Sequence, residues 1–227
     1  PSALAAREKG LPLVNIAQPF KSSGMMLTCR KDMGVNSTDD LKGKTLGVWF
    51  YGNEYPFLSW MSRLGLATDG SANGVTVLKQ GWGVEPLTEG QAACVSTMSY
   101  NEYWVVRDAG YTPEQLTVFK YQAEGASTLE DGLYVLEKNL GDDSFKDKMV
   151  RFVRASMKGW KYAEANPKEA ASIILDNDDA GVQTEKHQIR MMGEIAKLTA
   201  GSNGSLDPSD YERTVKVLMS GASDPVI

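Results

Sequence analysis

The amino-acid sequence predicts an α/β fold in a chain long enough for one large domain or two small ones. Short apolar segments typical of strands alternate with segments that repeat apolar residues at helical spacing over about the first 140 residues. The rest of the chain has only helical spacing. Hydrophobic residues make up 42% of the 227 residues, which is enough to fill a core.

The first part of the chain contains all the expected strands. We expect them at residues 13–18, 25–29, 45–50, 75–79, 92–98, 116–121 and 133–137. Between them we expect helices at residues 54–64 and 101–109, and shorter helical turns at residues 37–44 and 84–90. In the helix 54–64 one face carries Phe57, Trp60, Met61 and Leu64, and Gly65 follows its end.

From Ser144 onward the pattern is helical. A continuous apolar stripe runs along the first helix of this part and consists of Phe145, Met149, Phe152, Val153, Met157 and Trp160. A second helix opens at Asn166-Pro167, with Asn166 as the expected cap and proline at the first position. Two more helices are expected at residues 184–198 and from residue 207 on.

Composition and charge exclude several classes of function. The net charge is −5 and no basic run is present, so we expect no nucleic-acid partner. No apolar stretch approaches the ~20 residues that cross a bilayer. A single histidine, His187, lies in a polar helical stretch, so neither a zinc site nor a catalytic triad is expected. Cys29 and Cys94 fit two buried small hydrophobes better than a disulfide.

Three stretches together resemble a known family. They are residues 40–48 (DLKGKTLGV), residues 49–56 (WFYGNEYP), and residues 100–103 (YNEY) with residues 129–133 (LEDGL) downstream. The first occurs in many binding proteins, and the other two narrow the resemblance to the NMT1/THI5-like periplasmic substrate-binding proteins of ABC transporters. That group also contains binders of nitrate, taurine and alkanesulfonates.

The resemblance implies a type II periplasmic-binding-protein fold, with two lobes joined by a hinge. Lobe 1 would be built from residues 1–21 and 126–227, and lobe 2 from residues 25–120, with crossings near residues 21–24 and 122–127. Because family members normally begin with a strand, a helix and a strand ahead of this region, the first lobe is expected to lack its N-terminal β-α-β part. A periplasmic or lipid-anchored location, a monomer, no cofactor, and an ABC permease and ATPase as partners are also implied.

The candidate ligand-binding residues follow two predicted strands, because ligands of open α/β sheets bind beyond the carboxyl ends of strands. They are Trp49 near the end of the strand 45–50, Tyr51, Gly52, Asn53 and Glu54 after it, and Tyr100, Asn101 and Glu102 after the strand 92–98, with Ser23 at the first crossing and Glu130 downstream. Other roles remain open for some of them. Asn53 also fits a helix cap, Trp49 fits the core, and Glu130 fits a solvated loop.

The charge of these turns suggests the ligand. Glu54 and Glu102 would repel an anion and favour an amine, while tyrosine and tryptophan offer faces for a flat ring. A thiamine-precursor aminopyrimidine is therefore the expected ligand of a protein that catalyses no reaction. The alternatives are another small solute (an amine, a nucleobase-like compound, taurine or another sulfonate, or nitrate), a THI5-like pyrimidine synthase, and a sensor domain.

Overall fold

The computed structural model describes residues 1–220, which form two compact units. Unit 1 contains Pro1–Ser2, Gly24–Thr128 and the chain from Glu212 on, and unit 2 contains Ala3–Ser23 and Leu129–Tyr211. The helix α8 (Pro208–Met219) therefore begins in unit 2 and ends in unit 1. The alternation of strands and helices predicted for an α/β fold is confirmed.

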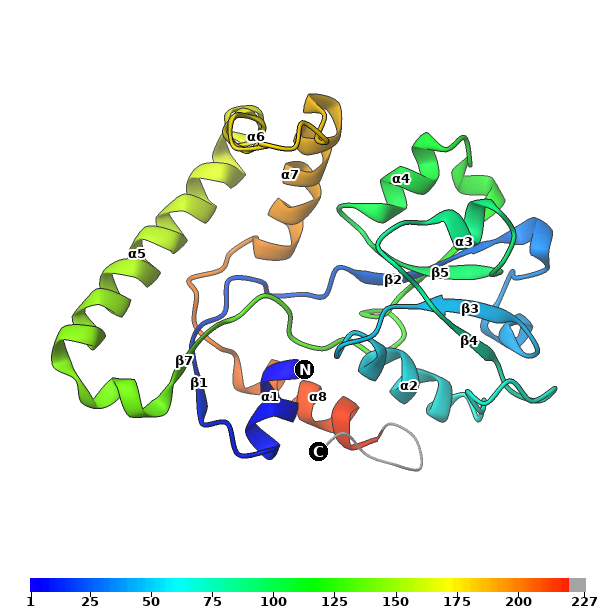
Figure 1. The fold of residues 1–227 in the computed structure, drawn as a ribbon, viewed down its shortest axis with the longest axis horizontal. Coiled ribbons are helices and arrows are strands. Elements are labelled where there is room, and N and C mark those ends of the chain that lie inside the picture. Colours follow the sequence, from blue (N-terminus) through cyan, green and yellow to red (C-terminus); the bar gives the residue numbers. More distant parts are fainter. Residues whose placement is uncertain (221–227) are drawn as a thin grey trace. The chain divides into compact units, whose positions relative to one another are not determined.

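Unit 1 is built on a five-stranded mixed sheet (Figure 1). Its strands, in spatial order, are β4 (Thr76–Lys79), β3 (Thr45–Val48), β5 (Cys94–Met98), β2 (Met25–Arg30) and β6 (Leu116–Lys120). β3 pairs in parallel with both β4 and β5, whereas β2 pairs antiparallel with β5 and β6. The carboxyl ends of β3, β4 and β5 consequently lie at the same edge of the sheet.

Helices cover both faces of this sheet. The unit contains α2 (Glu54–Arg63), α3 (Glu85–Thr88), α4 (Glu102–Asp108), and the short 3-10 helices η1 (Lys31–Met33), η2 (Thr38–Leu41) and η3 (Pro113–Gln115). α2 lies on one face, with α3 and α4 on the other (Figure 1). Successive side chains of β5 accordingly enter different cores: Cys94 joins the core under α2 and Val95 joins the core under α3 and α4.

The predicted apolar face of α2 is largely confirmed. Phe57, Trp60 and Met61 are fully buried, and the Trp60 ring lies 5.5 Å from the ring of Phe119 between centroids. Leu64 is 38% exposed instead, because α2 ends at Arg63 and the chain turns away there. Burial of three large side chains anchors α2 on the sheet and fixes where its first turn lies.

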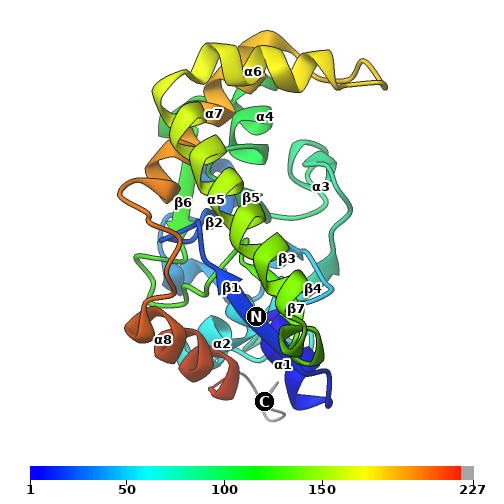
Figure 2. The ribbon, with the colours of Figure 1, turned by 90° about the vertical axis from the view of Figure 1, so that its left-hand side faces the viewer.

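Unit 2 contains a two-stranded antiparallel sheet and most of the helices. Its elements are α1 (Ser2–Glu8), β1 (Leu13–Ala17), β7 (Leu133–Leu136), η4 (Glu137–Gly141), α5 (Asp143–Ala165), α6 (Pro167–Asp176), α7 (Glu185–Thr199) and the start of α8. β1 pairs with β7. Figure 2 shows α5 along its full length, with α6 turning across its end. None of the described helices is long and apolar enough to cross a membrane.

Two expectations for unit 2 need correction. Asn166 does not cap α6: its side chain donates to the carbonyl of Tyr162, 2.9 Å away, and so closes the end of α5 instead. The stripe predicted on α5 is only partly covered, since Met157 is buried but Phe152 is 52% exposed. Helical spacing shows which side chains share a face, but it does not show whether another element covers that face.

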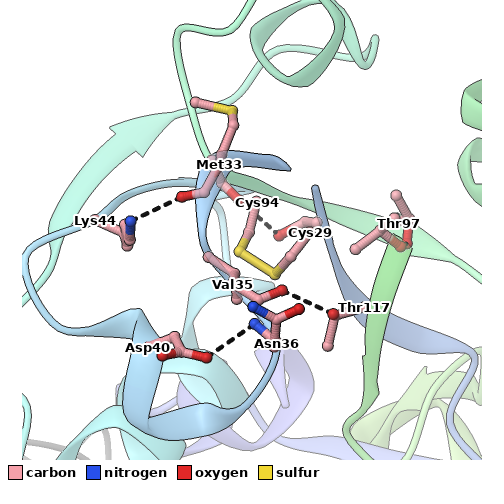
Figure 3. Close-up of a disulfide and its surroundings, with 12 residues drawn as sticks. Cys29, Met33, Val35, Asn36, Asp40, Lys44, Cys94, Thr97 and Thr117 are labelled. Carbon is pink, nitrogen blue, oxygen red and sulfur yellow. Dashed lines mark hydrogen bonds between the residues drawn. A yellow bond between two sulfur atoms is a disulfide. The ribbon is translucent and has the colours of Figure 1, made fainter. Parts of the chain in front are cut away.

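The two cysteines form a disulfide, so the expectation of two separate thiols was wrong (Figure 3). Cys29 on β2 and Cys94 on β5 are direct partners in the antiparallel register, with Cα atoms 3.9 Å apart. Both side chains are fully buried. The bond depends on strand register, which the sequence pattern of the two strands does not reveal.

Candidate functional site

A cavity of about 490 Å³ opens in unit 1 where β3, β4 and β5 end. Its lining residues come from the segments that directly follow these strands: Trp49, Phe50, Tyr51 and Asn53 after β3; Lys79, Gln80, Gly81 and Trp82 at the end of β4; and Met98, Tyr100, Asn101 and Glu102 at the end of β5. A hollow with aromatic walls and a few polar groups, at the carboxyl ends of parallel strands, has the features of a small-molecule site.

The segment after β3 supplies aromatic faces. Trp49 is half-buried; it packs against the main core of unit 1 and also lines the cavity. Its indole nitrogen donates to the carbonyl of Gly81 at 2.9 Å, which joins the segment after β3 to the one after β4. Tyr51 is 85% exposed at the cavity, and its φ of 65° turns the chain out of the strand.

Gly52 and Glu54 shape this turn without lining the cavity. Gly52 has a φ of 104°, a left-handed conformation that side chains rarely adopt, so a glycine is required there. The Glu54 carboxylate accepts the backbone N–H of Gly52 at 2.7 Å. Asn53 does line the cavity and makes no capping bond to α2; its side chain donates to the carbonyl of Phe50 at 3.3 Å.

The segment after β5 presents a carboxylate to the cavity. One oxygen of Glu102 accepts the backbone N–H of Met98 at 2.9 Å, and the other accepts the side-chain amide of Asn101 at 2.8 Å. Burial raises the pKa of the Glu102 carboxyl, although these hydrogen bonds act in the opposite direction. Tyr100 lies beside them in the lining. The predicted set of Tyr100, Asn101 and Glu102 is thus brought together at one wall.

The sequence analysis missed the four lining residues from β4. The Lys79 ammonium lies 4.8 Å from the ring centroid of Tyr51 and 5.7 Å from that of Phe50. Trp82, between two glycines, is 96% exposed and lines the cavity. A signal for these residues was present in the sequence: a short strand was expected at residues 75–79, and in a parallel sheet its end had to meet the ends of its neighbours.

Gln80 holds the β4 segment against the sheet. Its buried side-chain amide accepts the backbone N–H of Ser96 at 2.8 Å and donates to the carbonyl of the same residue at 3.0 Å. The amide therefore pairs with β5 as a peptide group of a neighbouring strand would. Gly47 makes room for it, because a Cβ there would lie 3.2 Å from the Gln80 oxygen. This arrangement fixes the position of Lys79 and Gly81 on either side.

Ser23 and Glu130, the remaining predicted ligand-binding residues, belong to unit 2. The Ser23 hydroxyl donates to the Glu130 carboxylate, and the backbone carbonyl of Glu130 accepts the buried side-chain amide of Gln18. Neither residue lines the cavity of unit 1. Within unit 2 their bonds join the end of β1 to the chain before β7.

A larger groove, of about 720 Å³, lies in unit 2 along α5. Its lining contains Met149, Val150, Val153 and Met157 of α5, four basic side chains of the same helix, and three residues from other segments. The basic side chains are Lys146, Arg154, Lys158 and Lys161, and the other three residues are Ile16, Leu140 and Asn203. The groove contains no aromatic side chain and no carboxylate. We place the candidate site in unit 1, because only there do several strand ends and hydrogen-bonding groups converge.

The described residues 1–220 contain no group of three or more histidine, cysteine, aspartate or glutamate side chains that could hold a metal ion. His187 lies in α7 of unit 2 and is not one of the residues that line the unit 1 cavity.

Comparison with known proteins identifies the family. The model of the family described as NMT1/THI5 like matches residues 1–170. The chain belongs to the NMT1/THI5-like family. The resemblance inferred from residues 40–56 and 100–103 is therefore confirmed.

Similar proteins support this assignment. The chain is 24% identical over 225 residues to a formylaminopyrimidine-binding protein of Halalkalibacterium halodurans, covering 96% of the chain and 66% of that protein. It thus spans just under two-thirds of the length of this relative.

Two crystal structures show a similar fold. One is the ligand-binding component of an ABC-type import system from Staphylococcus aureus, with a TM-score of 0.63, 13% identity, and coverage of 95% of this chain and 70% of that one. The other is the periplasmic aliphatic sulphonate-binding protein SsuA from Escherichia coli, with a TM-score of 0.61, 13% identity, and coverage of 96% and 65%. The type II periplasmic-binding-protein fold expected from the sequence is confirmed.

Proposed function

We propose that this chain is part of a substrate-binding protein that captures a small aminopyrimidine, a thiamine precursor, for an ABC importer. The observation that carries this proposal is the cavity at the ends of β3, β4 and β5, in which aromatic rings and a carboxylate line the same hollow. The likeness to a formylaminopyrimidine-binding protein supports the same ligand class. The proposed protein binds its ligand and does not transform it.

The ring of the ligand would lie against the aromatic walls. Trp49, Tyr51 and Tyr100 line the cavity from two strand ends, and Trp82 lines it from a third. Stacking of a flat heteroaromatic ring on such side chains contributes about 0.5–1.5 kcal/mol per pair beyond the burial of apolar area. Aliphatic solutes such as taurine would gain none of this stacking energy.

The amino group of the ligand would be bound by Glu102. An ionised carboxylate has about four lone-pair positions, and the Glu102 carboxylate accepts from the backbone of Met98, from the side chain of Asn101 and from its own backbone. The position left can accept an N–H of an exocyclic amine of the ligand. Since the bonds from Met98 and Asn101 already hold the carboxylate in place, little side-chain freedom is lost on binding.

The disulfide supports a location outside the cytoplasm. Disulfides form and persist in oxidising compartments, of which the bacterial periplasm is one, and Cys29–Cys94 is buried in the core of unit 1. A periplasmic or lipid-anchored monomer that delivers its ligand to a membrane permease and its ATPase fits this chemistry.

Calorimetric titration with 4-amino-2-methylpyrimidine tests the proposal. We expect saturable binding, at least tenfold weaker binding to Glu102→Gln, and at least tenfold weaker binding of 2-methylpyrimidine, which lacks the amine. The loss of a hydrogen bond to a charged acceptor, about 1.5–3 kcal/mol, sets this magnitude. Glu114→Gln, an exposed carboxylate on η3, is the matched control and is expected to bind as the unaltered chain does.

Two results would contradict the proposal. Equal binding of both pyrimidines would show that the amine is not recognised. Binding of taurine or another sulfonate, with no binding of either pyrimidine, would identify a different solute.

A further inference from the structure

The cavity of unit 1 carries two opposite charges on different strand ends. Lys79 ends β4 and Glu102 follows β5, and among the described residues of the lining they are the only lysine, arginine, aspartate or glutamate side chains. We infer that Lys79 selects aminopyrimidines that carry an oxyanionic substituent, such as a carboxylate or a phosphate ester. This inference rests on the proposed function and adds a substrate class, aminopyrimidines with a negatively charged substituent. The negative charges of Glu54 and Glu102, considered without Lys79, would have excluded such ligands.

The charge of Lys79 is not neutralised within the described chain. Its ammonium contacts the rings of Phe50 and Tyr51 and donates to the Tyr51 hydroxyl at 3.3 Å, and no carboxylate of residues 1–220 forms an ion pair with it. An ammonium has three donors. Two of them therefore remain for a ligand, while the ring faces hold the cation beside the cavity.

The carboxylates that would repel an anion are turned to other partners. Glu54 bonds the backbone of Gly52 and does not line the cavity. Glu102 accepts two donors at the end of β5, which disperse its charge. An oxyanion beside Lys79 on β4 and an amine beside Glu102 after β5 would each meet the complementary charge. The two charges would therefore favour one orientation of the ligand in the cavity over the reverse orientation.

Trp82 would increase the strength of this pairing. It is 96% exposed and lines the same cavity two residues after the Gln80 anchor. A ring that stacks on Trp82 displaces water next to Lys79. An ion pair in water contributes little, whereas a partly desolvated, hydrogen-bonded one contributes more.

The test compares two ligands of the same shape and different charge. These are 4-aminopyrimidine-5-carboxylate and 4-aminopyrimidine-5-carboxamide, titrated calorimetrically into the chain and into Lys79→Met. Quenching of tryptophan fluorescence is a second readout, since Trp49 and Trp82 line the cavity. We expect the chain to prefer the carboxylate at least tenfold, and Lys79→Met to lose that preference while it binds the carboxamide within about threefold of the unaltered chain. A tenfold preference corresponds to about 1.4 kcal/mol.

Lys79→Arg, which keeps the charge, is expected to retain most of the preference. Lys120→Met is the matched control, because Lys120 also ends a strand of unit 1 but its exposed side chain does not line the cavity. Titration with a phosphate ester of 4-amino-5-hydroxymethyl-2-methylpyrimidine, compared with the carboxylate, shows which oxyanion the chain prefers. A preference for the phosphate ester or for the carboxylate supports the inference if Lys79→Met abolishes it.

Three outcomes would overturn it. If the unaltered chain binds both ligands equally, or if Lys79→Met keeps the preference, the role of Lys79 is refuted while the aminopyrimidine function stands. If the unaltered chain binds no aminopyrimidine at all, both the proposed function and this inference fail.

Discussion

Removal of the disulfide of unit 1 tests the pairing of β2 with β5. The double variant Cys29→Ala, Cys94→Ala keeps the register from Met25↔Met98 to Cys29↔Cys94, because the strand hydrogen bonds remain. The native state should therefore still form. The unfolded chain, however, gains the freedom of a loop with a sequence separation of 65 residues. The chain-entropy relation gives a loss of about 4 kcal/mol in the free energy of unfolding.

Urea unfolding followed by tryptophan fluorescence measures this loss. Four of the five tryptophans, Trp49, Trp60, Trp82 and Trp104, belong to unit 1, so a Trp160→Phe background makes the signal report unit 1 alone. With a urea slope of about 2 kcal/mol per M, the midpoint should fall by about 2 M. Each single cysteine-to-alanine variant should lose a similar amount, since either one opens the loop.

The reasoning is refuted by two results. One is a double variant whose free energy of unfolding lies within about 1 kcal/mol of that of the parent, measured in the same background. The other is the titration of two free thiols in the denatured, unreduced protein, since both cysteines of the chain are paired in the structure.

Three more predictions concern single side chains. Gln80→Leu leaves the backbone N–H and C=O of Ser96 unpaired, so the free energy of unfolding measured in urea should fall by about 1–3 kcal/mol for each group. An unchanged free energy of unfolding would show that the Gln80 amide does not complete the sheet. Thr184→Ala removes the side-chain cap at the start of α7 and should cost about 1 kcal/mol. Asn166→Ala removes no capping bond from α6, only the bond to the Tyr162 carbonyl at the end of α5, and should cost less; the reverse order in thermal unfolding would contradict the observed caps. Burial raises the pKa of Glu102 in the folded chain above its unfolded value, so the stability that this group contributes is fully present below the unfolded pKa and is lost as pH rises through the folded pKa. In urea titrations at a series of pH values, the free energy of unfolding of the chain relative to that of Glu102→Gln should therefore fall between acid and neutral pH. A difference that does not change with pH would refute the shift.

Local patterns in the sequence predicted the elements well. The face of α2 with Phe57, Trp60 and Met61 follows from spacing along one helix, and the helix expected at residues 184–198 is α7, Glu185–Thr199. β3 was expected to continue to residue 50, but it ends at Val48, because Tyr51 and Gly52 adopt positive φ and the chain leaves the sheet. The family itself was recognisable from short motifs.

Predictions that required non-local pairing were less complete. Two of the three strand ends that form the cavity were found, and the third, with Lys79 and Trp82, was missed because the order of strands in the sheet was not considered. That omission affected the reasoning about ligand charge, which used Glu54 and Glu102 and no cation. Asn166 was expected to act on the helix after it, but its amide bonds the helix before it.

The sequence by itself determined the fold class, most element positions, the family, and the Tyr100-Asn101-Glu102 wall of the candidate site. These depend on residues within a few positions of each other, where periodicity and turn chemistry act directly. The tertiary structure decided the Cys29–Cys94 bond, the pairing of Gln80 with β5, and the presence of Lys79 in the cavity. Each of these depends on strand order and register, which are set by the packing of segments distant in the chain and not by the local pattern of either segment.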